Sequence, residues 1–406
     1  MWNSSIREGY LPVLWKSAFV APLPKKTPAQ QIQKDIRPIS LTPILCKELE
    51  VYPVQWIWES VADKVDPKQF GTVKGSSTIH ALVELLHHCY HNTDGSKKYA
   101  RLLLLDYTKA FDLINHHILM NKLELLDLPP FLLKWVAAFL TNRRQQVRIG
   151  NHSSDWMNLK GGVPQGTRLG PVLFILMIND LQLKSCMTYK YVDDTNILEI
   201  SKDPQSVSLQ IAATEASQWS KDNDMVINAS KTKELVINFS TTKFTNLRAL
   251  NIEGVQIERV YEAKTLGIII SADLKWNSHV DAITSKAGKR IHMLSQMKKA
   301  GVPVEDIIQM FCAKIRPVLE YACQAWHPGL TDYLSTDIER IQKCAMWIVY
   351  PNFMNHEALK CSGLDTSAER RKQLCIDFAK CMKHKDHKLH HLLPAVKEYR
   401  YNFLNV

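Results

Sequence analysis

The chain has 406 residues, 46% of them apolar, which is enough to bury several hydrophobic cores and argues against a disordered protein. Lysine and arginine outnumber aspartate and glutamate by 51 to 40, a balance that favours a polyanionic partner such as nucleic acid but also fits an ordinary basic protein. The nine cysteines include no C-x-x-C pair, and the longest apolar run, Pro171 to Ile178, is far shorter than the roughly 20 residues of a membrane-spanning helix. We therefore expect an intracellular protein with reduced thiols and with neither a secretion signal nor a membrane anchor.

Strand-like and helix-like stretches alternate in a way that predicts three zones. The first zone, residues 1–100, holds a short β-rich piece at Ala18–Pro22, a basic, proline-punctuated loop from Pro24 to Pro38, and a helix at Ile79–Tyr90. Its mixed pattern predicts short strands together with helices.

The second zone, residues 101–270, has the strongest strand signals, and the third, residues 271–406, is helical with a boundary near Ser271–Lys275. The predicted strands of the second zone are Leu102–Asp106, the two strands that flank Tyr191–Asp194, Glu234–Phe239 and Thr265–Ile270. Together the zones predict an α+β fold.

Three aspartates follow these strand signals. An apolar run ends in Asp106, which is typical of a buried central strand that delivers a carboxylate to the edge of a sheet, and Asp193 and Asp194 lie at the turn of a predicted hairpin. Adjacent carboxylates repel each other, so a shared divalent cation would stabilise them, and oxygen ligands suit Mg²⁺. Two such ions about 4 Å apart can activate a primer 3′-hydroxyl and stabilise the leaving pyrophosphate. An isolated Asp-Asp turn is more often only a solvated turn, so the inference depends on the ordered set of motifs.

A glycine-rich loop, Gly161–Thr167, lies between the acids and leads to a helix predicted to begin at Gly170-Pro171. Glycines would let the loop backbone and Gln165 approach a ligand closely, although most such loops are plain turns.

In chain order, the segments LLLLDYTKAFD, GGVPQG, YVDD, NASKTK and TLG resemble the palm of reverse transcriptases, and specifically those of non-LTR retrotransposons (LINE-type, CR1/Jockey-like). WKSAFVAPLPKK, RPISLTP, QFGTVKGSST, RPVLEYACQAWHP and GLDTSAERRKQLC extend the resemblance to nearly the whole chain. It implies a right-hand polymerase with fingers in residues 1–100, a palm of antiparallel sheet and helices in 101–270, and a helical thumb and C-terminal region in 271–406.

The resemblance also implies roles for single residues. Asp106 and Asp193 would be metal ligands with Asp194 as a third, less direct one, and two Mg²⁺ ions, or Mn²⁺ in their place, would be the cofactors. Phe111 matches the steric gate against a 2′-hydroxyl, and Gln165, next to Gly166, matches the residue that touches the sugar of the incoming nucleotide.

Further roles concern the triphosphate and the primer. Arg37 matches a residue that clamps the triphosphate, and Lys25 is a second candidate. Lys231 or Lys233 would protonate pyrophosphate as general acid, although either could be only a solvated lysine. Leu266-Gly267 resembles the primer grip, and the helix around Lys286–Lys299 resembles a thumb, although a solvated charged face explains its pattern almost as well.

The implied partners are an RNA template, a DNA primer and dNTPs, in the nucleus and cytoplasm and away from membranes, with the oligomeric state left open. Because the matching pattern begins at Trp2, we expect N-terminally truncated fingers and no upstream endonuclease. The alternatives are an intron-encoded or telomerase-like reverse transcriptase, and a catalytically inactive or co-opted nucleic-acid-binding remnant.

Histidines and cysteines also suggest a zinc site, at His116-His117 or among Cys375, Cys381, His384 and His387. Without a C-x-x-C pair we prefer core cysteines and a histidine cluster on a helix face.

Overall fold

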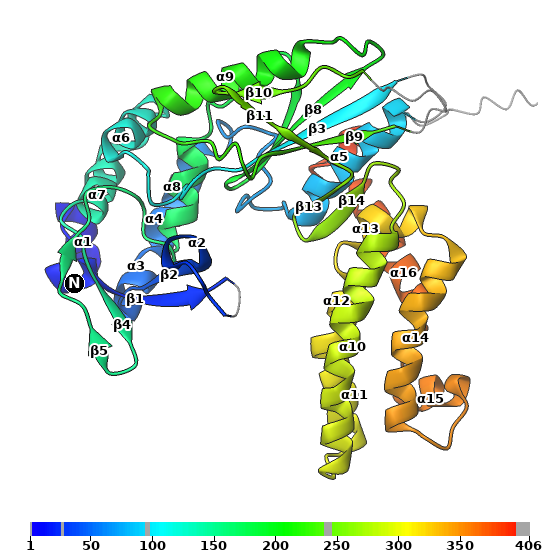
Figure 1. Cartoon of the computed structure of the whole chain (residues 1–406). Coiled ribbons are helices and arrows are strands. Elements are labelled where there is room, and N and C mark those ends of the chain that lie inside the picture. The colour runs from blue at the N-terminus through cyan, green and yellow to red at the C-terminus, as the bar shows by residue number, and fades with distance from the viewer. Residues whose placement is uncertain (1, 26–27, 94–97, 239–245, 395–406) are drawn as a thin grey trace, which may run out of the picture. The chain divides into compact units, whose positions relative to one another are not determined.

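A computed structural model describes residues 2–25, 28–93, 98–238 and 246–394. The chain divides into two compact units, and Figure 1 follows it from blue to red. Unit 1 comprises residues 1–73, 101–234 and 244–259, and unit 2 comprises residues 74–100, 235–243 and 260–406. Both units combine separate stretches of the chain, so they differ from the predicted zones 1–100, 101–270 and 271–406, and that division stays a prediction.

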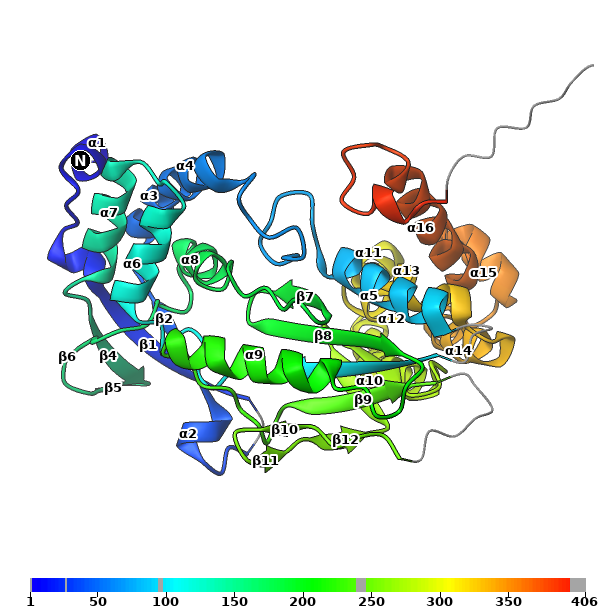
Figure 2. The same cartoon turned by 90° about the horizontal axis from the view of Figure 1, so that it is seen from above.

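The central sheet, built mainly from unit 1, has the strand order β12-β9-β3-β8-β7. Its strands are β3 (Tyr99–Leu105), β7 (Met187–Tyr191), β8 (Asp194–Ser201), β9 (Lys233–Ile237) and β12 (Glu258–Val260). β7 and β8 form an antiparallel hairpin, and α9 (Ser208–Asp222) lies along β8 (Figure 2). The predicted strands around the aspartates are confirmed, and so is the predicted strand from Glu234, although Phe239 lies outside the described residues.

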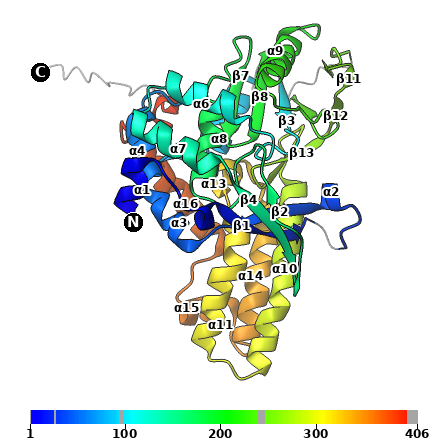
Figure 3. The ribbon, with the colours of Figure 1, turned by 90° about the vertical axis from the view of Figure 1, so that its left-hand side faces the viewer.

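A second sheet in unit 1, the N-terminal sheet, has the order β2-β1-β4-β5, with β6 also paired to β4. Its strands are β1 (Ser17–Pro24), β2 (Ile36–Leu41), β4 (Arg144–Ile149), β5 (His152–Ser153) and β6 (Met157–Asn158). β1 runs antiparallel to β2 and parallel to β4 (Figure 3). The predicted loop from Pro24 to Pro38 is therefore wrong over its last part, which is a short helix, α2 (Ile32–Asp35), and the start of β2. A strand tolerates Pro38 here because β2 is an edge strand, and Pro38 faces Pro22 across the pair.

Unit 1 also contains helices that pack mainly against one another. They are α1 (Trp2–Glu8), α3 (Ile44–Leu49), α4 (Val51–Val61), α6 (His116–Leu125), α7 (Pro130–Leu140) and α8 (Leu169–Met177). Every residue of α8 except Pro171 is buried, as expected for a helix that is apolar all round. α8 begins one residue before the predicted start, where the Gly170 N–H donates to the Thr167 hydroxyl at 3.1 Å. The Thr167 side chain, one residue before the N-cap Arg168, thereby accepts from an N–H in the first turn of the helix.

Unit 2 is mainly helical. Its helices include α5 (Thr78–Thr93), α10 (Asn277–Lys299), α11 (Val304–Met310), α12 (Arg316–Glu320), α13 (Cys323–Trp326), α14 (Asp332–Val349), α15 (Asn355–Ser362) and α16 (Ser367–Met382). α10 and α14 pack side by side (Figure 1), and the predicted apolar face of α10 is buried at Ile283, Ala287 and Leu294. Within the described residues, no helix is both long and apolar enough to cross a membrane.

The single strand predicted at Thr265–Ile270 is wrong. The chain forms a hairpin there, with β13 (Glu262–Thr265) antiparallel to β14 (Ile268–Ser271). Leu266 and Gly267 make the turn with φ of 44° and 89°, left-handed values that reverse the chain within two residues. With helices and sheets in both units, the predicted α+β fold is confirmed.

Candidate active site

Three aspartates, which we call the acid cluster, lie together at one end of the central sheet. Asp106 directly follows β3, Asp193 lies in the two-residue turn between β7 and β8, and Asp194 is the first residue of β8, the neighbour of β3. Burial raises the pKa of each carboxyl above its usual value, and that of Asp194 to about 6. After burial, the next causes for Asp194 are the charges of Asp193 and Asp106. The three carboxylates therefore share one electrostatic environment.

Asp106 is braced through its backbone. Its N–H donates to the Thr232 hydroxyl at 3.2 Å, and its carbonyl accepts from the Asn228 N–H at 2.7 Å. Its side-chain atom Oδ2 is buried without a hydrogen-bond partner among the described residues, and Lys231 Nζ lies 3.9 Å away. Lys233 instead pairs with Glu258 at 2.6 Å. Of the two lysines that the sequence leaves open, Lys231 is the one beside the acids.

The acid cluster suits a divalent cation chemically. The buried Asp106 oxygen has no donor among the described residues, and the pKa values of Asp193 and Asp194 are raised by burial and by neighbouring carboxylates. The oxygen and the carboxylates are both stabilised by a hard cation that prefers oxygen ligands. Within the described part of the chain, no three His, Cys, Asp or Glu side chains are already arranged to hold a metal. The three carboxylates would therefore have to close around an ion. The histidines and cysteines considered for zinc likewise form no such group among the described residues. His116 Nε2 contacts the Gly162 carbonyl at 2.7 Å.

The glycine-rich loop is held against β2. The Ser40 N–H of β2 donates to the Gln165 carbonyl at 2.8 Å. Gly166 has φ of 111°, and a Cβ there would lie 2.7 Å from the Ser40 carbonyl oxygen, so this position requires glycine. The loop therefore has a fixed backbone, and the Gln165 side chain points from it to Asp112, donating from Nε2 to Oδ1 at 3.3 Å.

Phe111 and Asp112 follow the strand that carries Asp106. The Phe111 ring stacks on Phe174 of α8 with centroids 4.8 Å apart, which fixes the predicted steric gate on the helix core. Asp112 was not predicted as a site residue. Burial raises its pKa, while its hydrogen bond from Gln165 acts in the opposite direction. The signal for it in the sequence is the second acid of LLLLDYTKAFD.

The two predicted triphosphate cations come from the N-terminal sheet. Arg37 is an exposed residue of β2, and Lys25 directly follows β1. Arg37 lowers the pKa of Asp193 and Lys25 lowers those of Asp106 and Asp112, although burial outweighs both effects. Both cations are thus close enough to act electrostatically on the acids.

The predicted primer grip, Leu266-Gly267, belongs to unit 2. The Tyr321 hydroxyl donates to the Leu266 carbonyl at 2.8 Å, and a Cβ on Gly267 would lie 2.8 Å from the Tyr321 ring. The turn is therefore well fixed within its own unit, and its role as a primer grip stays a prediction. The same holds for the predicted thumb helix, α10, whose Lys286, Lys289, Lys298 and Lys299 are exposed.

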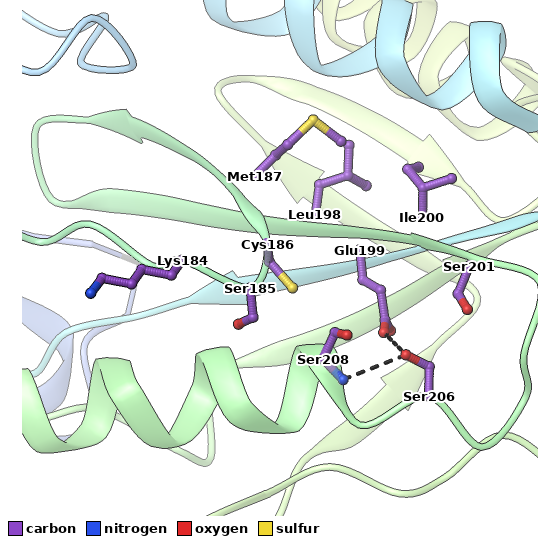
Figure 4. A pocket seen from close by; sticks show the side chains of 10 residues that line it. All are labelled: Lys184, Ser185, Cys186, Met187, Leu198, Glu199, Ile200, Ser201, Ser206 and Ser208. Atoms are coloured by element: carbon purple, nitrogen blue, oxygen red, sulfur yellow. Dashed lines mark hydrogen bonds between the residues drawn. The ribbon is translucent and has the colours of Figure 1, made fainter.

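A surface pocket of about 420 Å³ lies at the open end of the β7–β8 hairpin, the opposite end from the acid cluster. Figure 4 shows the Ser206 hydroxyl hydrogen-bonded to Glu199 and accepting from the Ser208 N–H at the start of α9. None of the predicted site residues lines this pocket, so it has no place in the predicted chemistry.

Comparisons with known proteins identify the family of the region that contains the acid cluster. The model of the reverse transcriptase (RNA-dependent DNA polymerase) family matches residues 23–270, which include the acid cluster and the glycine-rich loop. The probable RNA-directed DNA polymerase from transposon X-element of Drosophila melanogaster is 29% identical over 361 residues, covering 84% of this chain and 38% of that protein. Its counterpart from transposon BS is 26% identical, covering 80% and 37%, and that from mobile element jockey is 26% identical, covering 82% and 38%. The chain thus spans less than two fifths of the length of these relatives.

Among solved structures, apo telomerase from Candida tropicalis superposes with a TM-score of 0.49 at 10% identity, covering 96% of this chain and 67% of that one. A score at this level adds nothing to the assignment, which depends on the sequence family. Because the family model matches more than half of its residues, the chain belongs to the reverse transcriptase (RNA-dependent DNA polymerase) family.

Proposed function

We propose that this chain is the polymerase part of a non-LTR retrotransposon protein and that it extends a DNA primer on an RNA template. The observation that carries the proposal is the acid cluster, which joins Asp106 from the end of β3 to Asp193 and Asp194 from the β7–β8 turn inside the region that matches the family. Carboxyls that are gathered closely enough for Asp106 to raise the pKa of both Asp193 and Asp194 are typical of a site that binds metal and phosphate.

The acid cluster would hold two divalent ions, Mg²⁺ or Mn²⁺ in its place, through Asp106 and Asp193, with Asp194 as the third acid. Such ions supply charge stabilisation for the attacking 3′-hydroxyl oxygen and for the leaving pyrophosphate. Lys231, 3.9 Å from Asp106 Oδ2, is the proposed general acid that gives a proton to pyrophosphate. Lys233 is engaged by Glu258 and is left out of this role.

The incoming dNTP would lie between the glycine-rich loop and the N-terminal sheet. Arg37 and Lys25 would bind the triphosphate, and Gln165 and Gly166 would contact the sugar. Phe111, fixed by its stacking on Phe174, would exclude a 2′-hydroxyl because its ring cannot retreat into the α8 core.

The remaining assignments complete a right-hand polymerase. Residues 1–100 would be the fingers, 101–270 the palm, and 271–406 the thumb and C-terminal region, with the Leu266-Gly267 turn as primer grip. The exposed lysines of α10 would follow the phosphate backbone of the template–primer duplex. An intracellular location, in the nucleus and cytoplasm, stays a prediction from the sequence.

Primer extension on matched RNA and DNA templates tests the proposal. Wild type should add dNTPs on the RNA template, and Asp193→Asn should reduce the single-turnover rate at least about a hundredfold while duplex binding, measured by fluorescence anisotropy, stays within about twofold. Activity of Asp193→Asn within tenfold of wild type would refute the two-metal assignment. Duplex binding by wild type without addition of even one nucleotide would instead support the alternative of a nucleic-acid-binding remnant.

A further inference from the structure

The turn that carries Asp193 has a strained backbone. Val192, the residue before it, has φ of 56°, and a β-branched residue rarely adopts this left-handed conformation because its side chain crowds the backbone. Strain of this kind persists only where the surroundings hold it, and it is concentrated at functional sites. The contacts of Val192 therefore show what keeps the catalytic turn in place.

The side chain of Gln69 holds this turn directly. Its amide oxygen Oε1 accepts from the Val192 N–H at 3.1 Å and from the Gly71 N–H at 2.8 Å. The Gln69 residue is only 1% exposed, so water cannot easily replace it as acceptor. A single buried oxygen thus joins the catalytic turn to the segment QFG.

The same segment is paired with the strand that leads into the turn. The Phe70 N–H donates to the Lys190 carbonyl at 2.8 Å, and the Lys190 N–H donates to the Lys68 carbonyl at 2.9 Å. Lys190 is itself anchored, because its buried Nζ lies 2.6 Å from Asp66 Oδ2 and donates to the Ile178 carbonyl at 3.0 Å. Residues 66–71 therefore form a fixed brace along the end of β7.

Gly71 lets the brace reach the turn. A Cβ at this position would lie 2.6 Å from Val192 Cγ2 and also 2.6 Å from the Val192 backbone nitrogen. Any side chain at position 71 would therefore displace the turn. Shortening Val192 would not remove the clash, because the backbone nitrogen would remain.

We infer that Gln69 and Gly71 are positioning residues for the acid cluster: Gln69 keeps Val192 in its left-handed conformation and thereby sets where Asp193 and Asp194 stand relative to Asp106. The inference rests on the proposed function. Neither residue contacts the reacting atoms, so both act through the backbone of the turn.

The test compares two substitutions of nearly equal size. Gln69→Met keeps the length of the side chain but removes the acceptor oxygen, whereas Gln69→Glu, neutral when buried, keeps a carbonyl oxygen there. In single-turnover addition on a primed RNA template at saturating dNTP, Gln69→Met should be slower by about tenfold or more, and Gln69→Glu should recover most of that loss. Equal rates for Gln69→Met and wild type would overturn the inference.

Mn²⁺ binding, followed by the electron paramagnetic resonance of the free ion, tests the same point without catalysis. Gln69→Met should weaken Mn²⁺ binding severalfold while the thermal unfolding midpoint and duplex affinity stay close to wild type, because the brace positions the acids. Mn²⁺ affinity, the unfolding midpoint and duplex affinity could instead all fall together in Gln69→Met, with no recovery in Gln69→Glu. That result would mean that Gln69 only supports the fold and would overturn the inference.

Gly71→Ala gives an independent measurement if Gln69→Met does not fold. It should lower both the addition rate and Mn²⁺ affinity, and Val192→Ala in the same chain should not restore them, because the clash with the backbone nitrogen remains. Restoration by Val192→Ala would show that the added methyl group only crowds the Val192 side chain and does not displace the backbone of the turn. That result would overturn the inference. If wild type adds no nucleotide, the proposed function fails, and the Mn²⁺ affinities of these variants still decide the inference.

Discussion

The two ends of the β3–β8 strand pair carry different arrangements of charged side chains, with opposite charges paired at one end and like charges close together at the other. At one end, Arg101 Nε lies 2.6 Å from Glu234 and its Nη1 lies 3.6 Å from Glu199, and all three side chains are at most 3% exposed. At the other end, Asp106 and Asp194 carry charges of the same sign, and Asp106 Oδ2 has no hydrogen-bond donor within the described ranges. Arg101 and Asp106 are five residues apart in the sequence, and so are Asp194 and Glu199. Each segment therefore supplies one residue to the ion-pair end and one to the acid-cluster end.

The difference separates a structural use of charge from a functional one. Buried opposite charges add little net stability compared with apolar residues, but they tie strands together because removing one partner leaves a charge stranded. Like charges destabilise the fold until a proton or a cation reaches them. The end of the sheet where like charges lower the stability of the fold is therefore the end where we place catalysis.

The largest expected effect is on activity at the acid cluster. Asp106→Asn should reduce nucleotide addition by about a thousandfold or more, because a neutral amide cannot replace a metal-binding carboxylate. The thermal unfolding midpoint should stay level or rise, since one of three repelling charges is gone. A midpoint that falls by more than about 5 °C, which corresponds to roughly 2 kcal/mol for a unit of this size, would show that Asp106 serves the fold.

At the opposite end the expectation is reversed. Arg101→Met should lower the free energy of unfolding by about 3–5 kcal/mol, because Glu199 and Glu234 both lose a buried cationic partner, and Arg259, which also pairs with Glu234, is more exposed. The addition rate per folded molecule should not change. Lys221→Met is the matched control, since its exposed pair with Glu253 at 3.2 Å should contribute at most about 1 kcal/mol. Urea unfolding of the three proteins measures this contrast, and equal losses in both variants would contradict it.

A smaller effect separates the two lysines near the acids. Lys231→Met should slow single-turnover addition by about a hundredfold if Lys231 is the general acid, and the loss should depend on pH. Lys233→Met removes an ion pair with Glu258, whose carboxylate is largely exposed, and a hydrogen bond to the Ser230 carbonyl. Its addition rate should stay within about threefold of wild type. The reverse order of the two effects would transfer the acid role to Lys233.

Local patterns in the sequence were sufficient to predict the strands that carry the acids. An apolar run ending in Asp106, and strand-like residues on both sides of Tyr191–Asp194, each describe one element by itself. The start of α8 was predicted within one residue for the same reason, because glycine and proline mark it locally.

What the sequence did not reveal depends on contacts between distant segments. Gln69 and Gly71 have no distinctive local pattern, and their importance appears only where they meet Val192. The predicted strand begins one residue after Arg101. Burial of this arginine depends on Glu199 of β8 and Glu234 of β9, which are distant in the sequence. β2 was missed because Pro38 indicates a loop unless the strand is known to lie at an edge.

The smallest expected effect is a dependence of stability on pH that only the acid-cluster end should show. The pKa of Asp194 is raised to about 6 from 3.8, by burial first and then by Asp193 and Asp106, so the folded state binds this proton more tightly than the unfolded state. The stabilisation by the proton is therefore complete below pH 4 and is lost as the pH rises through about 6. Because Asp194 is partly exposed, solvent screening should limit this loss to about 1 kcal/mol. Urea unfolding between pH 4 and pH 8, without divalent ions, should thus show a larger decline for wild type than for Asp194→Asn. Mg²⁺ should reduce the decline more in wild type than in Asp194→Asn, since it replaces the proton as the partner of the carboxylates and the variant lacks one of the three. Parallel curves for the two proteins, with and without Mg²⁺, would mean that Asp194 behaves as a solvated surface acid, and the contrast between the two ends of the sheet would then depend on Asp106 and Asp193.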